Sequence, residues 1–298
     1  MKKVGWIGTG NMGKRMSRRL MNAGYELHIC DKIKANTDPL VADGAILEPT
    51  AAELAKKVDC IFCMIPNGAI LKDVIYGKDG AVKTIDKHTI VVDMSTIDPK
   101  SSSEVNAKLD EVGVSFLRAT VTGSIAFAEE GTLGIMASGD KKTYETMLPL
   151  LKILGNRQTY VGTHEEARYM KIIINMMVGT TMQMLAESLV VGEKVGVDWN
   201  TMIDLIADSA AASPIIKFKV DALKQRDFSA MATSKFMEKD MNIALDIAKE
   251  SELCLPITAV SRQFYTAMRA NSLGDVDYSG VVLVNEKLNG LKNSYTAK

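Results

Sequence analysis

Two polar side chains stand four residues apart in an apolar segment, and their types suit proton transfer. Lys171 and Asn175 lie among isoleucines, methionines and valines, and a helix would place both on one face. An apolar setting disfavours a charged ammonium, so this lysine either reaches solvent or faces a polar cavity. In a cavity it can take or give a proton as a general base or acid. Lys171 is therefore the candidate for proton transfer, with an exposed surface lysine as the alternative.

A glycine pattern near the N-terminus suits a different chemistry, the binding of a phosphate group. Gly8, Gly10 and Gly13 form G-x-G-x-x-G between a strand-like and a helix-like segment. Gly8 permits a tight turn, Gly10 lets the backbone approach a pyrophosphate, and Gly13 lets helix and strand pack closely. Asn11 and Met12 lie where free N–H groups at the helix start face an anion. The pattern predicts a dinucleotide-binding loop.

An acidic residue at the end of the second strand-like segment predicts which dinucleotide binds. Asp31 lies 18 positions after Gly13, close to the spacing of about 20 that this motif shows. Its carboxylate can accept hydrogen bonds from ribose hydroxyls and would repel a 2′-phosphate, which favours NAD over NADP. Lys32 and Lys34 leave NADP open, because a nearby cation tolerates the extra phosphate.

The first half of the chain has the pattern of a sheet that can position these loops. Short apolar runs alternate with helical patterns, which is typical of βαβ units and a parallel sheet. The predicted strands are 3–8, 26–31, 59–65, 89–94, 114–119, 133–138 and 158–161. Helix start signals fall between them, including a capping box at 50–53 and Asp98 before Pro99. We therefore predict an α/β fold with a doubly wound N-terminal Rossmann domain over residues 1–162.

Beyond residue 162 helical periodicity dominates, which predicts an all-α C-terminal domain over residues 163–298. A capping box at 163–166 opens a pattern that runs to about Val195, with Gly196 as its stop. Apolar residues cover nearly all sides of this long helix, which predicts that it is buried, with its methionines as core packing. We expect the helix to join the two domains. Further helices are predicted to start near Asp198, Ser213, Ser234, Pro256 and Asp277.

Composition excludes several classes of partner. Lys plus Arg total 36 and Asp plus Glu total 36, so the formal net charge is zero and no basic field exists for nucleic acid. Asn175, Gln183 and Glu187 interrupt the long apolar segment and argue against a membrane span. The three histidines are scattered without ligand spacing, so no metal site is predicted. Without an export signal or a disulfide framework, we expect the cytoplasm.

The only cysteine motif is a C-x-x-C inside a predicted strand. Residues i and i+3 on a strand point to opposite faces, whereas redox pairs usually lie at a helix start. We therefore interpret Cys60 and Cys63 as two small buried hydrophobic residues.

Taken together, these motifs resemble the β-hydroxyacid dehydrogenases, the family that includes 3-hydroxyisobutyrate dehydrogenase and tartronate semialdehyde reductase. The resemblance spans nearly the whole chain and implies a C-terminal domain of the 6-phosphogluconate dehydrogenase-like type. It rests on the glycine loop, 64–67, 93–99, 121–124, 131–133, Lys171 with Asn175, and Lys239 with Asp240. It also implies a homodimer or homotetramer. The motifs are specific for the family and say little about the substrate.

The resemblance implies further contacts with the cofactor. Ile65, Pro66 and Thr96 follow predicted strands at the carboxyl edge of the sheet, where open α/β sheets bind ligands. In the family this edge touches the cofactor, and a lysine at the place of Lys239 lies near it. Ordinary turns after the strands, and an exposed lysine, are the alternatives.

The resemblance also assigns the substrate side. It implies that Thr122, Gly123 and Ser124 grip a substrate carboxylate, that Lys171 is the general acid and base, and that Asn175 orients it or the substrate. Ser124 stands where the family has a second glycine, which removes backbone freedom and adds a donor.

Two other stretches depart from the family pattern. Residues 118–120 are Arg-Ala-Thr in place of the usual Asp-Ala-Pro, and Glu165 and Ala167 replace two glycines before Lys171. Acidic residues suit a helix start, so we expect the helix to be secure. Close approach of a substrate at this loop is left open.

The implied function is the reversible NAD(P)-dependent oxidation of a small, carboxylate-bearing β-hydroxy acid to its semialdehyde. Within the family, a sulfolactaldehyde reductase and a succinic or glyoxylic semialdehyde reductase are alternatives, although Gly123 stands where the sulfolactaldehyde branch has arginine. Lys171 argues against an imine reductase, and the chain is short for 6-phosphogluconate dehydrogenase. A nicotinamide-binding sensor without turnover is the alternative of another class.

Overall fold

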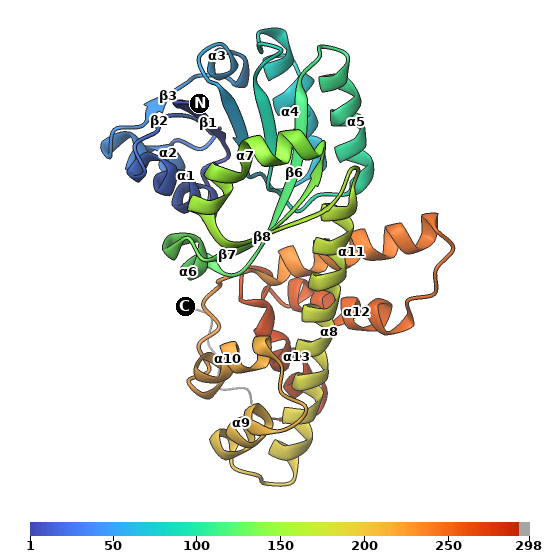
Figure 1. Ribbon diagram of the computed structural model, residues 1–298. Coiled ribbons are helices and arrows are strands. Elements are labelled where there is room, and N and C mark those ends of the chain that lie inside the picture. The colour runs from blue at the N-terminus through green and yellow to red at the C-terminus, as the bar shows by residue number, and fades with distance from the viewer. Residues whose placement is uncertain (292–298) are drawn as a thin grey trace. The chain divides into compact units, whose positions relative to one another are not determined.

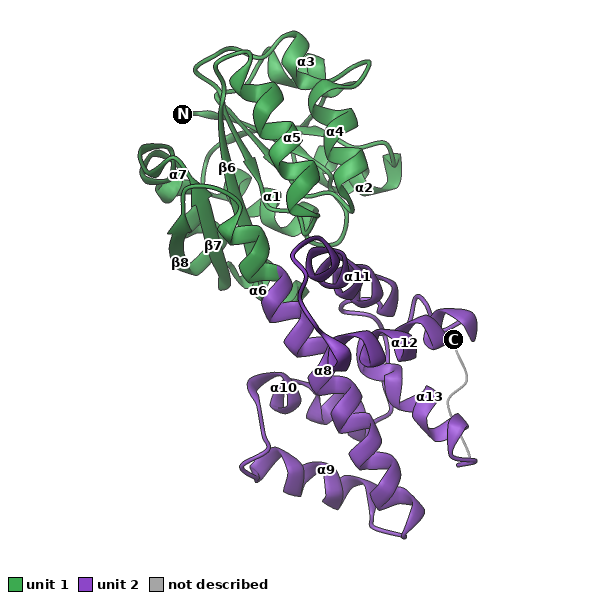
Figure 2. Cartoon of the chain, turned by 90° about the vertical axis from the view of Figure 1, so that its right-hand side faces the viewer, with its two compact units in different colours: residues 1–171 green, residues 172–298 purple. Residues whose placement is uncertain are grey.

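The computed structural model describes residues 1–291, and the chain forms two compact units (Figures 1 and 2). Unit 1 is Met1–Lys171 and unit 2 is Ile172–Lys298. The division falls inside a long helix, α8 (Glu166–Lys194), whose first residues belong to unit 1. The predicted domain boundary at residue 162 lies just before this helix.

Unit 1 contains an eight-stranded sheet with the order β3-β2-β1-β4-β5-β6-β7-β8. The strands are β1 (Lys3–Ile7), β2 (Glu26–Cys30), β3 (Ile46–Leu47), β4 (Cys60–Cys63), β5 (Ile90–Asp93), β6 (Ser115–Thr122), β7 (Leu133–Gly139) and β8 (Gly155–Gly162). The first six are parallel, as predicted, but β7 runs antiparallel to β6 and β8 pairs parallel with β7. The sequence did not predict β3, because its two residues are exposed at the sheet edge and carry no alternation.

Helices cover both faces of the sheet (Figure 1). They are α1 (Gly13–Asn22), α2 (Lys34–Ala42), α3 (Ala51–Ala55), α4 (Gly68–Tyr76), α5 (Pro99–Asp110), α6 (Ile125–Glu130) and α7 (Lys141–Leu154), with a short 3₁₀ turn, η1 (Ala81–Lys83). One core joins Met16 of α1 and Leu150 of α7 to the sheet, and the other joins Leu71 of α4 and Val105 of α5 to its opposite face. This is the doubly wound arrangement that the sequence predicts.

The predicted caps of unit 1 form. Thr50 Oγ1 accepts from the Glu53 amide at 3.1 Å, and Asp98 Oδ1 accepts from the Ser101 amide at 2.7 Å. Each cap satisfies an N–H group that has no partner inside its helix. Helix start signals were therefore sufficient to locate these helices.

The interpretation of the two strand cysteines is confirmed. Cys60 and Cys63 are buried and free, and they belong to the cores on opposite faces of β4. Burial raises the pKa of the Cys60 thiol to about 12 and that of Cys63 well above its usual range. A raised pKa disfavours the thiolate, which fits two small buried hydrophobic residues.

Unit 2 is helical, as predicted. After α8 come α9 (Trp199–Asp208), α10 (Pro214–Lys224), α11 (Ser234–Glu250), α12 (Pro256–Ala270), the 3₁₀ turn η2 (Tyr278–Gly280) and α13 (Val281–Leu288). Asp198 and Ser213 cap α9 and α10 through their side-chain oxygens. The hydrophobic core of unit 2 contains Leu189 of α8, Met241 of α11 and Tyr265 of α12.

The start of α8 corrects the predicted capping box at residue 163. Strand β8 continues to Gly162, so the chain must turn over 163–165 before the helix begins. The amides of Arg168 and Tyr169 donate to the Glu165 carbonyl at 2.9 and 3.1 Å, which puts Glu165 in the N-cap place. Burial works to raise the pKa of Glu166, but backbone hydrogen bonds, including one from the His164 amide, lower it below its usual value.

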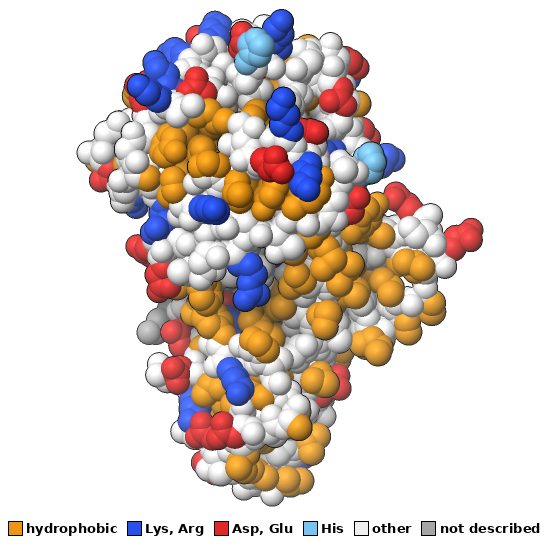
Figure 3. Space-filling model, viewed as in Figure 1, with side chains coloured by type: hydrophobic (Ala, Val, Ile, Leu, Met, Phe, Trp, Pro, Cys, Tyr) orange, Lys and Arg blue, Asp and Glu red, His pale blue; other side chains and the backbone are white. Residues whose placement is uncertain are grey.

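Within residues 1–291, only one side of α8 is covered, which corrects the expectation that it is buried all round. Leu185 and Leu189 face the core of unit 2, whereas Met177, Met184 and Val191 are 62%, 53% and 65% exposed. By length and composition α8 could cross a membrane, and 39% of its most apolar window is buried. Figure 3 shows hydrophobic side chains gathered over this part of unit 2. The other helices of unit 2 pack against a single face of α8. The sequence pattern alone does not show how many faces of this helix are covered.

The methionines of unit 2 likewise fall into a buried group and an exposed group. A Cβ atom on Gly179 would lie 2.8 Å from Met237 Sδ and 3.0 Å from Met241 Sδ, so these side chains fill the space that a glycine leaves on α8. For them the prediction of core packing is confirmed. It is wrong for Met177 and Met184, which are exposed.

Candidate functional site

The three glycines of the loop between β1 and α1 have distinct surroundings. Gly8 has φ +89°, and a Cβ there would lie 2.3 Å from the Met64 carbonyl oxygen. A Cβ on Gly13 would lie 1.9 Å from the Gly8 carbonyl oxygen, so helix and strand pack without room for a side chain. A Cβ on Gly10 would meet nothing within 4 Å. The loop is therefore tight at both ends and open in the middle.

The open part of the loop fits an anion. Within residues 1–291 the amides of Asn11 and Met12, which precede α1, donate to no hydrogen bond. They stand at the start of a ten-residue helix, where the helix dipole adds positive character. The residues present thus suit the pyrophosphate of a dinucleotide.

Asp31 follows β2 and is tied to the glycine loop. Its Oδ2 accepts from the Thr9 amide at 2.7 Å and from Thr9 Oγ1 at 3.1 Å, and its Oδ1 accepts from the Ile33 amide at 2.8 Å. Sequence reasoning missed Thr9, whose only signal was its place between two loop glycines. Asp31 therefore fixes the loop while its carboxylate stays partly exposed.

The two lysines after Asp31 are each engaged with an aspartate. Lys32 Nζ lies 2.9 Å from Asp73 Oδ2, and Lys34 pairs with Asp38 one helical turn on. Hydrogen bonding to Asp73 raises the pKa of Lys32. These contacts do not direct the ammonium group of either lysine toward a phosphate at Asp31.

The ends of β4 and β5 meet beside the glycine loop. The Ile65 amide donates to Ser95 Oγ at 2.9 Å, and Ser95 Oγ donates to Asp93 Oδ1 at 2.6 Å. The Ile65 side chain is buried under the loop, with its Cγ2 2.8 Å from where a Gly8 Cβ would be. Thr96 is half-buried next to Ser95, and Pro66 is exposed. The structure thus gathers most of the predicted cofactor residues at one edge of the sheet.

The predicted substrate loop follows β6. Thr122 is half-buried at the end of the strand, and Gly123 has φ +127°, a conformation that favours glycine. Ser124 precedes α6, and its Oγ is buried without a hydrogen-bond partner within residues 1–291. A buried hydroxyl without a partner is costly, and a ligand oxygen would satisfy it.

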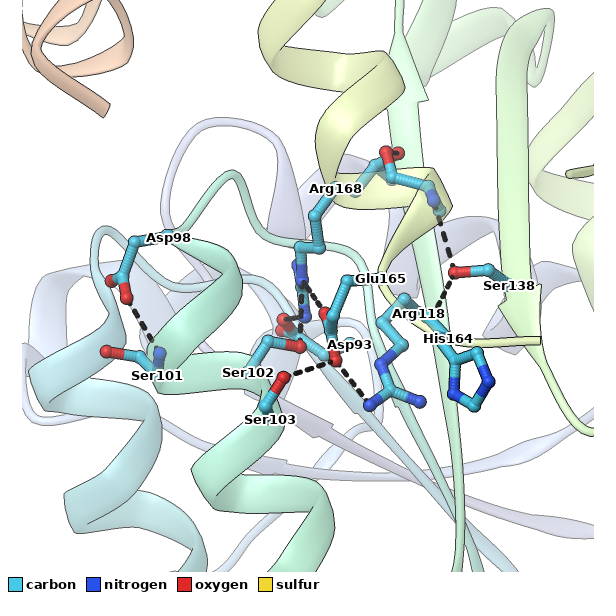
Figure 4. A network of polar contacts seen from close by, with 12 residues as sticks. Asp93, Asp98, Ser101, Ser102, Ser103, Arg118, Ser138, His164, Glu165 and Arg168 are labelled. Atoms are coloured by element: carbon cyan, nitrogen blue, oxygen red, sulfur yellow. Dashed lines mark hydrogen bonds and ion pairs between the residues drawn. The ribbon is translucent and has the colours of Figure 1, made fainter. Parts of the chain in front are cut away.

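Lys171 lies on the second turn of α8 and is half-buried. It is the last residue of unit 1. The first turn of the same helix carries Arg168, whose guanidinium pairs with Asp93 in the interior of unit 1 (Figure 4). Sequence reasoning missed Arg168, because an arginine at a helix start gives no sign of burial.

In unit 2, Asp240 of α11 joins two of the predicted residues. Asn175 Nδ2 donates to Asp240 Oδ2 at 2.5 Å, and Lys239 Nζ lies 3.1 Å from Asp240 Oδ1. Asp240 is 6% exposed, so its side chain is buried beside these two partners. Lys239 also lines a shallow hollow of about 420 Å³ together with Lys235 and Arg269. The sequence paired Asp240 with Lys239 as a motif and gave it no role.

No metal site accompanies these groups. Among residues 1–291, no cluster of three or more His, Cys, Asp or Glu side chains could hold a metal ion. His28 lies on β2, where its Nε2 is 2.9 Å from Glu26 Oε1 and its Nδ1 is 2.8 Å from Glu48 Oε1.

In the comparison with known proteins, each of the two units matches a family model. Residues 3–162 match the model for the NAD binding domain of 6-phosphogluconate dehydrogenase. Residues 166–284 match the model for the NAD-binding domain of NADP-dependent 3-hydroxyisobutyrate dehydrogenase. Together the two models cover nearly all of the described chain.

Curated relatives match along nearly their full length. The chain is 33% identical to 2-(hydroxymethyl)glutarate dehydrogenase of Eubacterium barkeri, over 98% of this chain and 97% of that protein. It is 31% identical to glyoxylate/succinic semialdehyde reductase 1 of Arabidopsis thaliana, over 94% of this chain and 97% of that protein. The structure of 3-hydroxyisobutyrate dehydrogenase from Mycobacterium tuberculosis aligns with a TM-score of 0.87 at 24% identity, covering 96% and 99% of the two chains. The structural match confirms the predicted fold.

Proposed function

The chain belongs to the β-hydroxyacid dehydrogenase family, and we propose that Lys171 is the general acid and base of its reaction. The protein is an NAD(P)-dependent oxidoreductase that acts on the CH–OH group of a hydroxy acid. The observation that carries the proposal is the place of Lys171. It is half-buried on a helix whose first turn is held at the sheet edge that carries the loops at residues 65 and 95–96.

The chemistry needs one proton to move with one hydride. NAD would be held at the glycine loop and Asp31, and it would supply the acceptor for the hydride on the carbon that carries the hydroxyl. Lys171, as a neutral amine, accepts the hydroxyl proton while the C–H bond breaks and the C=O bond forms. In the opposite direction its ammonium returns that proton to the carbonyl oxygen, so each cycle balances.

For the substrate we propose a small semialdehyde, or the matching hydroxy acid, that carries a carboxylate. Ser124 Oγ supports this, because it is a buried donor without a partner among residues 1–291, next to a glycine that frees the backbone. A carboxylate oxygen would accept from it and from the Thr122 hydroxyl. The names of two relatives point to substrates of the same class, glyoxylate or succinic semialdehyde and 2-(hydroxymethyl)glutarate.

We further propose that NAD is preferred over NADP. The partly exposed Asp31 carboxylate would repel a 2′-phosphate. Lys32 and Lys34, the cations that would offset this repulsion, are engaged with Asp73 and Asp38. Kinetics with NADH and NADPH side by side test this preference, and equal kcat/KM for the two contradicts it.

We also propose that a second copy of the chain covers the exposed face of α8. Met177, Met184 and Val191 repeat every seven residues along that face and are more than half exposed. An apolar stripe of this kind is typical of a protein–protein interface rather than of a solvated surface. Homo-oligomerisation would bury this stripe without the need for a different partner protein.

Substitution of Lys171 tests the central proposal. Lys171→Ala should lower kcat by about 10³-fold, the range of a general acid or base, and leave NADH binding nearly intact. Lys194→Ala is the matched control, since it removes an exposed lysine from the end of the same helix. Turnover is measured as NADH oxidation with a panel of small semialdehydes. Wild-type turnover by Lys171→Ala would refute the proposal, and inactivity of the unmodified protein on the whole panel, with tight NADH binding, would favour a sensor.

A further inference from the structure

Four charged side chains are buried together at the start of α8 (Figure 4). Asp93, Arg118, Glu165 and Arg168 are 0%, 5%, 8% and 1% exposed. They come from the end of β5, from β6, from the turn before α8 and from the first turn of α8. Burial of charge is expensive unless each group is paired, and networks of this kind need not add stability. Their position suggests another role.

The guanidinium of Arg168 uses all three of its nitrogens. Nε donates to Ser102 Oγ at 3.1 Å, one terminal nitrogen donates to the Ser95 carbonyl at 2.6 Å, and the other pairs with Asp93 Oδ2. Ser102 belongs to α5, so three elements are joined through one side chain. A planar fork of fixed geometry makes such contacts, and a lysine does not.

The contacts continue to the loops at the cofactor edge. Asp93 accepts from Ser95 Oγ, which in turn accepts from the Ile65 amide. Thr96 is the next residue along the chain from Ser95. Arg168 therefore connects the loops after β4 and β5 to the first turn of α8, and Lys171 stands three residues further along that helix.

A second ion pair holds the same turn. Arg118 donates to Glu165 Oε1 at 2.5 Å, and Ser103 Oγ donates to the same oxygen at 3.3 Å. Thr120 Oγ1 donates to the Ala167 carbonyl at 2.9 Å. Both stretches in which the sequence departs from the family pattern, 118–120 and 165–167, thus meet each other, with opposite charges at 118 and 165.

We propose that Arg168 is a positioning residue, which fixes Lys171 relative to the loops at 65 and 95–96, and that the Arg118–Glu165 pair holds the same turn in place. The inference rests on the proposed role of Lys171. Proton transfer requires the donor and acceptor within hydrogen-bond reach, and a displacement of about 1 Å can cost about 10²-fold in rate. A glycine-containing turn at 165–167 would have no side chains for this purpose.

Conservative substitution tests the inference. Arg168→Lys keeps the charge and loses the fork, so kcat should fall by about 10²-fold while KM for NADH changes much less. The pH–rate limb that depends on Lys171 should also shift, because its surroundings change. Ser102→Ala removes one acceptor without disturbing charge, and it should lower kcat several-fold and shift the same limb; it decides the matter if Arg168→Lys does not fold.

Lys219→Met is the matched control, since the Lys219–Asp277 pair is as buried as the Arg168–Asp93 pair but lies in unit 2. It should lower the melting temperature and leave kcat and the pH profile unchanged. Wild-type kcat and pH profile in both Arg168→Lys and Ser102→Ala, or the same losses in Lys219→Met, would overturn the inference. If Lys171→Ala keeps its turnover, the proposed function itself fails. If Lys171→Ala is inactive while the Arg168 and Ser102 variants behave as wild type, only the positioning role fails.

Discussion

Each unit contains a fully buried ion pair, and the two pairs connect different parts of the molecule. In unit 1, Arg168 and Asp93 link the first turn of α8 to the loops after β4 and β5. In unit 2, Lys219 Nζ lies 2.8 Å from Asp277 Oδ1, and Asp277 Oδ2 accepts from two backbone amides in the loop before α11. The second pair closes a loop of the helical core. Burial of an ion pair therefore does not by itself identify a functional site. A functional role is indicated by the groups that the pair connects.

The surfaces of the two units differ as well. More of the large exposed hydrophobic side chains belong to unit 2, although it is the smaller unit, and several lie along α8. The sheet of unit 1 has helices on both faces, whereas α8 packs on one side only. The difference supports the proposal that a second copy of the chain covers the exposed face of α8 in unit 2.

Within unit 2, the largest expected effect is on stability. Lys219→Met leaves Asp277 buried without its cation and should destabilise the protein by about 3 kcal/mol. Denaturant unfolding measures this loss, and kcat measured well below the melting temperature should match the wild type. A loss of kcat in the folded variant would remove the distinction between the two buried pairs.

The exposed face of α8 gives the next effect. Met184→Glu places a charge in the proposed interface and should weaken self-association by about 2 kcal/mol, roughly 30-fold in the dissociation constant. Light scattering over a concentration series follows the change, with Lys152→Glu on α7 as the control. An unmodified protein that is monomeric at all concentrations contradicts the proposed interface.

A smaller effect is expected at Asp240 of unit 2. Asp240→Asn weakens the hydrogen bond from Asn175 and removes the anion beside Lys239. The loss of one charge-assisted hydrogen bond corresponds to about 1.5 kcal/mol, or roughly tenfold in kcat/KM. Steady-state kinetics should show this decrease without a change in melting temperature of the size expected for Lys219→Met. Unchanged kinetics would leave Asp240 as a packing residue.

The smallest effect is a pH dependence of opposite sign in the two units. Burial works to raise the pKa of Glu48 in unit 1, but hydrogen bonds from Lys57 and His28 outweigh it, so the pKa lies below its usual 4.5. The stability that Glu48 contributes is present above that value and is lost as pH falls through the lower, folded value.

In unit 2, burial raises the pKa of Glu286 above 4.5 despite the Arg226 guanidinium. Its contribution is present below the usual value and is lost as pH rises through the higher, folded value. Hydrogen exchange between about pH 3 and about pH 6 should show protection of β2 increasing with pH and protection of α13 decreasing. Parallel trends in both elements would contradict the assignment.

The sequence predicted the parts of the molecule that depend on local pattern. Alternating strands and helices, the glycine loop and the caps at Thr50 and Asp98 all follow from neighbouring residues. The N-cap of α8 was misplaced, because β8 extends to Gly162 through pairing with β7, which no local signal marks.

The contacts across the chain were beyond the sequence. Arg118 and Glu165 are 47 positions apart, and each was visible only as a departure from the family pattern. Arg168 was missed altogether, because its burial depends on its contacts with Asp93 of β5 and Ser102 of α5. For α8, the apolar pattern predicted burial of most faces, but it did not show which of them the chain itself covers.

Chemical rescue of Lys171→Ala tests the central claim most directly. Small primary amines are added to the folded variant, and NADH oxidation is followed with the best semialdehyde of the panel. Lys171 as acid and base predicts that turnover returns in proportion to amine concentration, with a dependence on amine basicity, while NADH binding stays constant. Full turnover without amine, or no response in a variant that binds NADH and substrate normally, would contradict it.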